Sequence, residues 1–136
     1  MRVIALDVGE KRIGVAASDP LGRTAQPLET IERDERFAGR LEKLIEELGA
    51  ERLVVGLPLS MDGSEGSQAE AVRRFVEEIE GRLKIPVTFL DERLSSREAN
   101  SVIAEAESKP GRERGATDRV AAALILRAYL DSLPEG

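Results

Sequence analysis

The stretch Val3-Ile4-Ala5-Leu6-Asp7-Val8-Gly9-Glu10-Lys11-Arg12-Ile13-Gly14-Val15-Ala16 decides how this chain folds. An apolar run ends on one aspartate, turns at Gly9 and resumes as a second apolar run from Ile13 to Ala17, which predicts a β-hairpin. Asp7 therefore closes a strand that is expected to be buried. A carboxylate out of water is costly unless it is hydrogen-bonded, paired or bound to a metal. The simplest interpretation is that Asp7 accepts backbone N–H bonds in the turn.

The composition limits the chemistry that this chain can perform. Its 136 residues predict a single domain, residues 1–136, with room for one central sheet covered by helices. Cysteine and histidine are both absent, which excludes thiolate nucleophiles, serine triads and the usual zinc sites. Catalysis must therefore use carboxylates, hydroxyls, lysine and arginine, and hard cations such as Mg²⁺ or Mn²⁺ are the natural metal partners.

Net charge and hydropathy bear on nucleic-acid binding, membrane contact and localisation. The formal net charge is -6, so nucleic acid would have to be held by local basic residues rather than by the charge of the whole domain. We find no signal region and no apolar run of membrane-spanning length, and we therefore expect a cytoplasmic protein without membrane contact.

The order of apolar patterns predicts an α/β fold in which a mixed five-stranded sheet is flanked by helices. A weaker third strand, 24–31, contains Pro27, which favours an edge position. The remaining elements are two strands at 53–55 and 87–90, and helices at 37–48, 72–83, from Ser95 or Ser96 to Ala106, and 118–132. The segment from Glu107 to Ala116 is expected to be a flexible basic loop.

Acidic residues occupy three special places in this order. Asp7 ends the first strand, Asp91 and Glu92 follow the fifth, and Asp118 begins the last helix. The carboxyl ends of parallel strands share one edge of an α/β sheet, which is where ligands bind. Small and apolar residues one and two turns beyond Asp118 place it on the helix face that packs toward the sheet. We therefore expect these acids to converge.

Converging carboxylates repel one another and raise each other's pKa unless a cation shares them. Two oxygen-ligated metal ions roughly 4 Å apart can activate water for attack on a phosphodiester without histidine. Each acid also has a simpler explanation. Asp7 could be a turn residue, Asp91 and Glu92 exposed strand-end charges, and Asp118 a favourable acid at a helix N-terminus. Only their convergence favours catalysis.

Basic residues near these acids are candidates for nucleic-acid binding. Two lie in the hairpin turn, one directly follows Glu92, and three lie in the basic loop: Lys11, Arg12, Arg93, Lys109, Arg112 and Arg114. For the loop residues, plain solvation is the more common explanation, because a loop with alternating charges is more often simply solvated.

Four motifs, in order along nearly the whole chain, resemble those of the YqgF/RuvX family. They are Leu6-Asp7-Val8-Gly9 with Lys11-Arg12-Ile13-Gly14-Val15-Ala16, then Val55-Gly56-Leu57-Pro58-Leu59-Ser60-Met61-Asp62-Gly63, then Asp91-Glu92-Arg93-Leu94-Ser95, and finally Asp118 with Ala121-Ala122 and Ile125-Leu126. Two positions depart from the family pattern. Ser60 stands where asparagine is common, and Glu113 interrupts the basic loop.

The resemblance implies a ribonuclease H-like fold, related to RuvC-type Holliday junction resolvases, and metal-dependent nuclease chemistry. Family members are described as nucleases that mature the 5′ end of pre-16S ribosomal RNA or as Holliday junction resolvases. Carried over by motif, Asp7, Glu92 and Asp118 would be the catalytic, metal-binding acids, with two Mg²⁺ or Mn²⁺ ions and with Asp91 in support. A four-way junction needs two symmetric cuts and would predict a homodimer, whereas a monomer would favour RNA trimming.

Two other functions are compatible with the pattern. An aspartate-x-glycine hairpin also serves as a phosphate loop in nucleotide-binding modules of the actin and sugar-kinase type, but those proteins use two such domains around a cleft. A non-catalytic nucleic-acid-binding scaffold would keep the fold without activity, although all three acids are present here.

Overall fold

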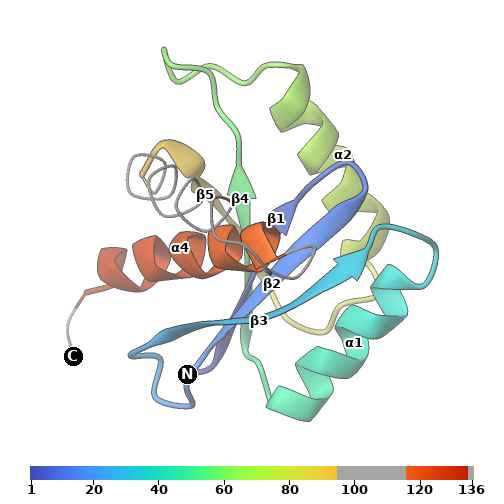
Figure 1. Ribbon diagram of the computed structural model, residues 1–136, viewed down its shortest axis with the longest axis vertical. Helices are drawn as coiled ribbons and strands as arrows, with labels where there is room; N and C mark the ends of the chain where they lie inside the picture. The colour runs from blue at the N-terminus through green and yellow to red at the C-terminus, as the bar shows by residue number, and fades with distance from the viewer. Residues whose placement is uncertain (95–115, 135–136) are drawn as a thin grey trace.

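A computed structural model describes residues 1–94 and 116–134 of the chain. Five strands form one sheet in the order β3-β2-β1-β4-β5. In chain order they are β1 (Val3–Val8), β2 (Arg12–Ser18), β3 (Ala25–Glu32), β4 (Arg52–Leu57) and β5 (Val87–Asp91). The first three strands are antiparallel neighbours, and β4 and β5 run parallel to β1. The predicted mixed five-stranded sheet is therefore confirmed (Figure 1).

The hairpin predicted from the opening stretch is β1 and β2. Its turn is closed by a hydrogen bond from the Gly9 N–H to the Arg12 carbonyl oxygen, 3.0 Å. A Cβ on Gly9 would lie 2.6 Å from that same carbonyl, so the tight turn depends on glycine at this position. β3 is an edge strand, as Pro27 predicts, and its register against β2 shifts between Val15 and Ala16.

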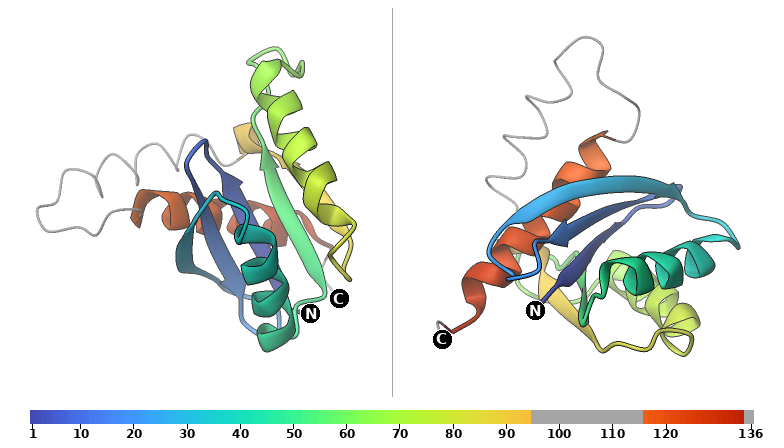
Figure 2. Two further views of the ribbon diagram at one scale, coloured as in Figure 1. Left: turned by 90° about the vertical axis from the view of Figure 1, so that its right-hand side faces the viewer. Right: turned by 90° about the horizontal axis from the view of Figure 1, so that it is seen from below.

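Helices cover both faces of the sheet (Figure 2). Helices α1 (Phe37–Leu48) and α2 (Ser67–Glu80) lie on one face, and α4 (Ala116–Ser132) crosses the other. α1 ends at Gly49, whose φ of 64° is the left-handed conformation of a glycine stop. α2 ends at Glu80, although the sequence predicted that this helix would extend to Leu83. α4 begins at Ala116, two residues before the predicted start at Asp118. The helix predicted from Ser95 or Ser96 lies outside the described residues.

The core is divided into two layers by the alternation of side chains along each strand. Ile4 and Leu6 of β1 pack with the apolar residues of α1 and α2, whereas Val3 and Ala5 pack with α4. Both layers include residues that are completely buried, each worth about 1.5–3 kcal/mol of hydrophobic stabilisation. The same alternation places Asp7 on the α4 face, because it follows Val3 and Ala5 at a spacing of two.

Candidate active site

Asp7 is a strand residue, because it lies inside β1, where its backbone pairs with Gly14 of β2. Its carboxylate faces the α4 side of the sheet, at the edge where the parallel strands end. The hairpin turn itself is closed by backbone atoms of other residues. The partner of the Asp7 carboxyl is Glu92, with which it shares a hydrogen bond. Asp7 therefore belongs to a side-chain cluster.

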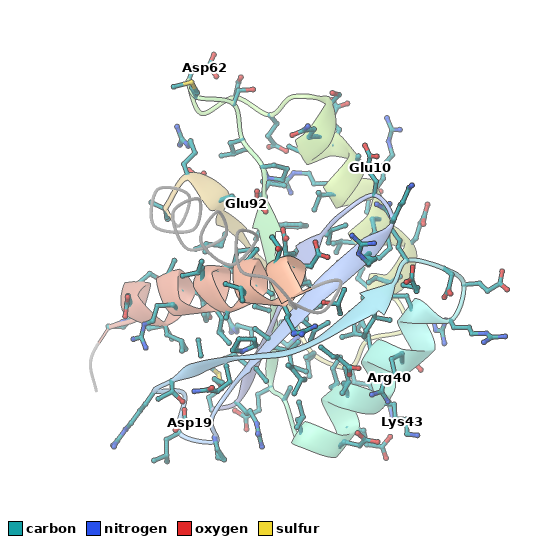
Figure 3. All side chains as sticks on the ribbon, in the orientation of Figure 1. Glu10, Asp19, Arg40, Lys43, Asp62 and Glu92 are labelled. Carbon is teal, nitrogen blue, oxygen red and sulfur yellow. The ribbon has the colours of Figure 1, made fainter. Side chains whose placement is uncertain are left out.

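Glu92 is brought to Asp7 by the end of β5. The chain continues from β5 into a single 3-10 turn, η1 (Glu92–Leu94), and Figure 3 shows Glu92 beside the ends of the strands. Its side chain fits there because residue 56 is glycine. A Cβ on Gly56 would lie 2.6 Å from Glu92 Oε1 and 2.6 Å from Ile125 Cδ1. This glycine at the end of β4 therefore makes room for the acid and for α4 together.

Asp118 lies in the first turn of α4. The helix approaches β2 so closely that a Cβ on Gly14 would lie 1.9 Å from the Asp118 carbonyl oxygen. Asp118 is near enough to Asp7 for its negative charge to raise the Asp7 pKa. Its own Oδ2 accepts a hydrogen bond from Arg12 Nε at 3.2 Å. The structure thus brings together the three acids predicted from the sequence and adds an arginine.

Burial and crowding change the acidity of two of these groups. Burial, reinforced by the charge of Asp118, raises the pKa of Asp7 to about 6, although the hydrogen bond from Glu92 acts in the opposite direction. Burial also raises the pKa of Glu92 to about 7, together with the charge of Asp7, the hydrogen bond to it and the charge of Asp91. Near neutral pH the pair therefore holds a proton, and Glu92 donates it to Asp7.

The donor set fits a hard divalent cation. Carboxylate oxygens are the preferred protein ligands of Mg²⁺ and Mn²⁺. A bound cation would also reduce the repulsion between the two half-buried carboxyls of Asp7 and Glu92. Among the residues that the structure describes, no group of three acidic side chains is arranged so that it could hold a metal ion. Asp118 Oδ2 accepts a hydrogen bond from Arg12, so a metal shared with Asp118 would take its other oxygen or displace the guanidinium.

The predicted basic residues fall into three groups. Lys11 is exposed in the hairpin turn, and Arg12 is half-exposed beside Asp118. Arg93 forms a fork with Asp91, with Nη2 2.6 Å from Oδ2, and its Nη1 donates to the Met61 carbonyl oxygen at 3.3 Å. This contact anchors the loop between β4 and α2, a role that the sequence did not suggest. Lys109, Arg112 and Arg114 lie outside the described residues.

A hollow of about 280 Å³ opens beside Glu92. It lies between the hairpin turn, the loop after β4 and the first turns of α2, and Arg33 lines it. Arg33 Nη1 donates to the Gly9 carbonyl oxygen at 2.9 Å, and its guanidinium lies over the Phe75 ring. Sequence reasoning missed Arg33, because nothing adjacent in the chain links it to the hairpin.

Comparisons with known proteins show which family and which relatives the chain resembles. A family model described as "RuvX: Holliday junction resolvase" matches residues 1–132. A protein of Moorella thermoacetica named "Putative pre-16S rRNA nuclease" is 50% identical, with 98% of this chain and 96% of that protein covered. One of the same name from Desulforamulus reducens is 46% identical, with 97% of this chain and 98% of that protein covered.

Solved structures share the fold at much lower sequence identity. RuvC of T. thermophilus, in complex with a Holliday junction substrate, matches with a TM-score of 0.61 at 14% identity, with 97% of each chain covered. The fowlpox virus Holliday junction resolvase matches with a TM-score of 0.59 at 12% identity, with 98% of this chain and 100% of that chain covered. These matches confirm the predicted ribonuclease H-like fold.

Proposed function

The chain belongs to the RuvX family and is a nuclease, a hydrolase of phosphodiester bonds, and from this premise we propose that Asp7, Glu92 and Asp118 form its metal-dependent active site. The observation that carries the proposal is the half-buried pair of Asp7 and Glu92, which are hydrogen-bonded to each other beside Asp118. Taking two like charges out of water is energetically unfavourable, and a bound divalent cation would offset that cost.

The two metal ions, Mg²⁺ or Mn²⁺, would be held by the three acids and would activate water and stabilise the leaving oxygen. The chain itself supplies position and acidity. β1 holds Asp7 rigidly, and η1 together with the space above Gly56 fixes Glu92. Glu92 gives up its proton when the site is loaded, because a ligating carboxyl must be ionised. Apolar residues of α4 such as Ile125 shield the inner side of the cluster from water.

Basic residues would hold the nucleic-acid backbone beside the acids. Lys11 lies in the hairpin turn and Arg12 is the first residue after it. Both would be within reach of a phosphate that enters the site. Lys109, Arg112 and Arg114 remain candidates from the sequence alone. Arg93 could contribute only by releasing Asp91 or by using a donor that the fork leaves over.

The substrate that we favour is structured RNA at the 5′ end of pre-16S rRNA, because relatives that are 46–50% identical over almost the whole chain carry the name of that activity. A four-way DNA junction is the second candidate, supported by the description of the family model. Cutting a junction symmetrically would need a homodimer with two sites. No helix in the described part of the chain could span a membrane, and we place the protein in the cytoplasm with its substrate.

Cleavage assays test the active site and the substrate together. Labelled 16S precursor RNA, a four-way DNA junction and a linear duplex would each be incubated with Mn²⁺, Mg²⁺ or EDTA. We expect metal-dependent cutting that Asp7→Asn, Glu92→Gln and Asp118→Asn each abolish. Asp131→Asn is the matched control, because it changes an exposed acid at the other end of α4.

The outcomes distinguish the candidates. Cutting of the precursor RNA alone supports the rRNA nuclease, and symmetric cutting of the junction by a dimer supports the resolvase. Cutting that survives all three substitutions would overturn the assignment of the site. If the folded protein binds these substrates but cuts none of them under any condition, the protein is a scaffold and the proposal fails.

A further inference from the structure

Arg12 is a half-exposed residue whose guanidinium faces one of the proposed metal ligands. Its Nε lies 3.2 Å from Asp118 Oδ2, although the two residues are 106 positions apart in the chain. Arg12 is the first residue of β2, directly after the hairpin turn, and Asp118 lies in the first turn of the helix that crosses β2. The backbone of both residues is fixed by the sheet and by the close approach of α4 at Gly14.

The position of Arg12 balances the charge of the cluster. Asp7, Glu92 and Asp118 are three carboxyls gathered at one edge of the sheet, where Asp7 and Glu92 are hydrogen-bonded to each other. Arg12 compensates Asp118. A divalent cation held by Asp118 would therefore compete with the guanidinium for the same carboxylate, and even on the other oxygen the two positive charges would repel each other.

A phosphate offers Arg12 an alternative partner. A guanidinium binds two phosphate oxygens at once, in the same manner as it binds a carboxylate. The ion pair with Asp118 is half-exposed, so water and salt screen it and it is easily exchanged. The long, flexible side chain can turn away from Asp118 without any movement of β2 or α4.

We propose that Arg12 is a positioning residue that holds Asp118 until a phosphate of the nucleic acid takes over its guanidinium, so that substrate binding and divalent-metal binding favour each other. This inference rests on the proposed function of the site. It goes further by assigning the order of events, because Asp118 becomes fully available to the metal only when substrate is present. Linkage requires the effect to be reciprocal, so that bound metal also raises the affinity for nucleic acid.

The first test measures Mn²⁺ binding in the absence of nucleic acid, by water-proton relaxation, for the wild-type protein, Arg12→Gln and Lys11→Gln. Arg12→Gln removes the competitor, and we expect Mn²⁺ to bind about threefold more tightly or better. Lys11→Gln is the matched control, because it removes the same charge from the adjacent position. Among the described residues Lys11 forms no ion pair with Asp118. We expect its effect to be clearly smaller.

The second test measures how metal and nucleic acid affect each other. The affinity for a labelled precursor RNA or four-way junction is measured by fluorescence anisotropy in EDTA and in Ca²⁺. The wild-type protein should gain affinity in Ca²⁺, and Arg12→Gln should gain less while binding more weakly in EDTA. Arg12→Lys keeps the charge but not the planar fork, so its Mn²⁺ affinity should fall between those of the wild type and Arg12→Gln.

Three results would overturn the proposal: Mn²⁺ binding by Arg12→Gln no tighter than by the wild type, an equal gain in Lys11→Gln, or an unchanged Ca²⁺ effect in Arg12→Gln. If Arg12→Gln does not fold, Arg12→Lys decides by the same comparison. If the wild-type protein binds neither nucleic acid, the proposed function fails and the coupling fails with it. The Mn²⁺ measurements alone would then show whether Arg12 competes with the metal.

Discussion

Replacing Asp7 by asparagine is expected to stabilise the metal-free protein while abolishing its activity. The substitution keeps the size of the side chain and its ability to accept a hydrogen bond from Glu92, but it removes a half-buried negative charge. Burial and the charge of Asp118 raise the pKa of Asp7 from 3.8 to about 6. A shift of about two pKa units corresponds to about 3 kcal/mol of destabilisation when the group is fully ionised.

The sign of the pH dependence follows from the direction of that shift. The folded state holds its proton on Asp7 more tightly than the unfolded state, so this group costs nothing below pH 3.8. Stability is lost as the pH rises through about 4 to 6 and stays lost above that range. The advantage of Asp7→Asn should therefore be about 3 kcal/mol at pH 8 and about half of that at pH 5.

Urea unfolding in EDTA at pH 5 and pH 8, for the wild type and Asp7→Asn, measures this difference directly. The same curves with Mg²⁺ provide the control, because a bound cation should stabilise the wild type more than the variant. A variant that is less stable than the wild type at pH 8, or a stability advantage of the variant that does not grow with pH, would refute the claim that the folded structure raises the pKa of Asp7.

Substitutions of the glycines and of the loop anchor test the geometry around the acids. Gly14→Ala should destabilise the protein by about 3 kcal/mol or more, measured by urea unfolding, because its Cβ would overlap the Asp118 carbonyl. Gly56→Ala should lower the cleavage rate by about 10- to 100-fold by displacing Glu92, and an unchanged rate would contradict this placement. Arg93→Ala should leave the midpoint of urea unfolding almost unchanged, because the fork is exposed, yet limited proteolysis should cut the loop after β4 faster. Equal proteolysis of both proteins would show that Arg93 does not anchor the loop.

Much of the fold follows from local patterns in the sequence. The hairpin, the edge position of the strand with Pro27 and the bounds of the helix at 37–48 were predicted from neighbouring residues, and the structure agrees. The predicted end of α2 at Leu83 was wrong. Apolar residues continue at helical spacing up to Leu83, past the last helical residue, Glu80. Such a residue can pack against the core from a turn as well as from a helix.

The part of the candidate site that sheet topology determines could be predicted from the sequence. Asp7 and Glu92 end strands on the same edge of the sheet, and their convergence follows from that rule. The ion pair of Arg12 with Asp118 depends on where α4 crosses β2, which no local pattern encodes. The space that Gly56 leaves for Glu92 is likewise a contact between distant segments, and in the sequence that glycine indicates only the end of a strand.

The same contacts give this histidine-free chain two carboxyl groups whose pKa values lie near neutral pH. A group that exchanges a proton near neutral pH is usually a histidine, because its unperturbed pKa lies there. Here the sheet edge and α4 enclose two carboxyls closely enough to bring their pKa values to about 6 and about 7. The enclosure depends on two glycines, Gly14 beneath the start of α4 and Gly56 beneath Glu92. Backbone packing at these two positions therefore gives ordinary acids a proton affinity in the range where histidine usually works.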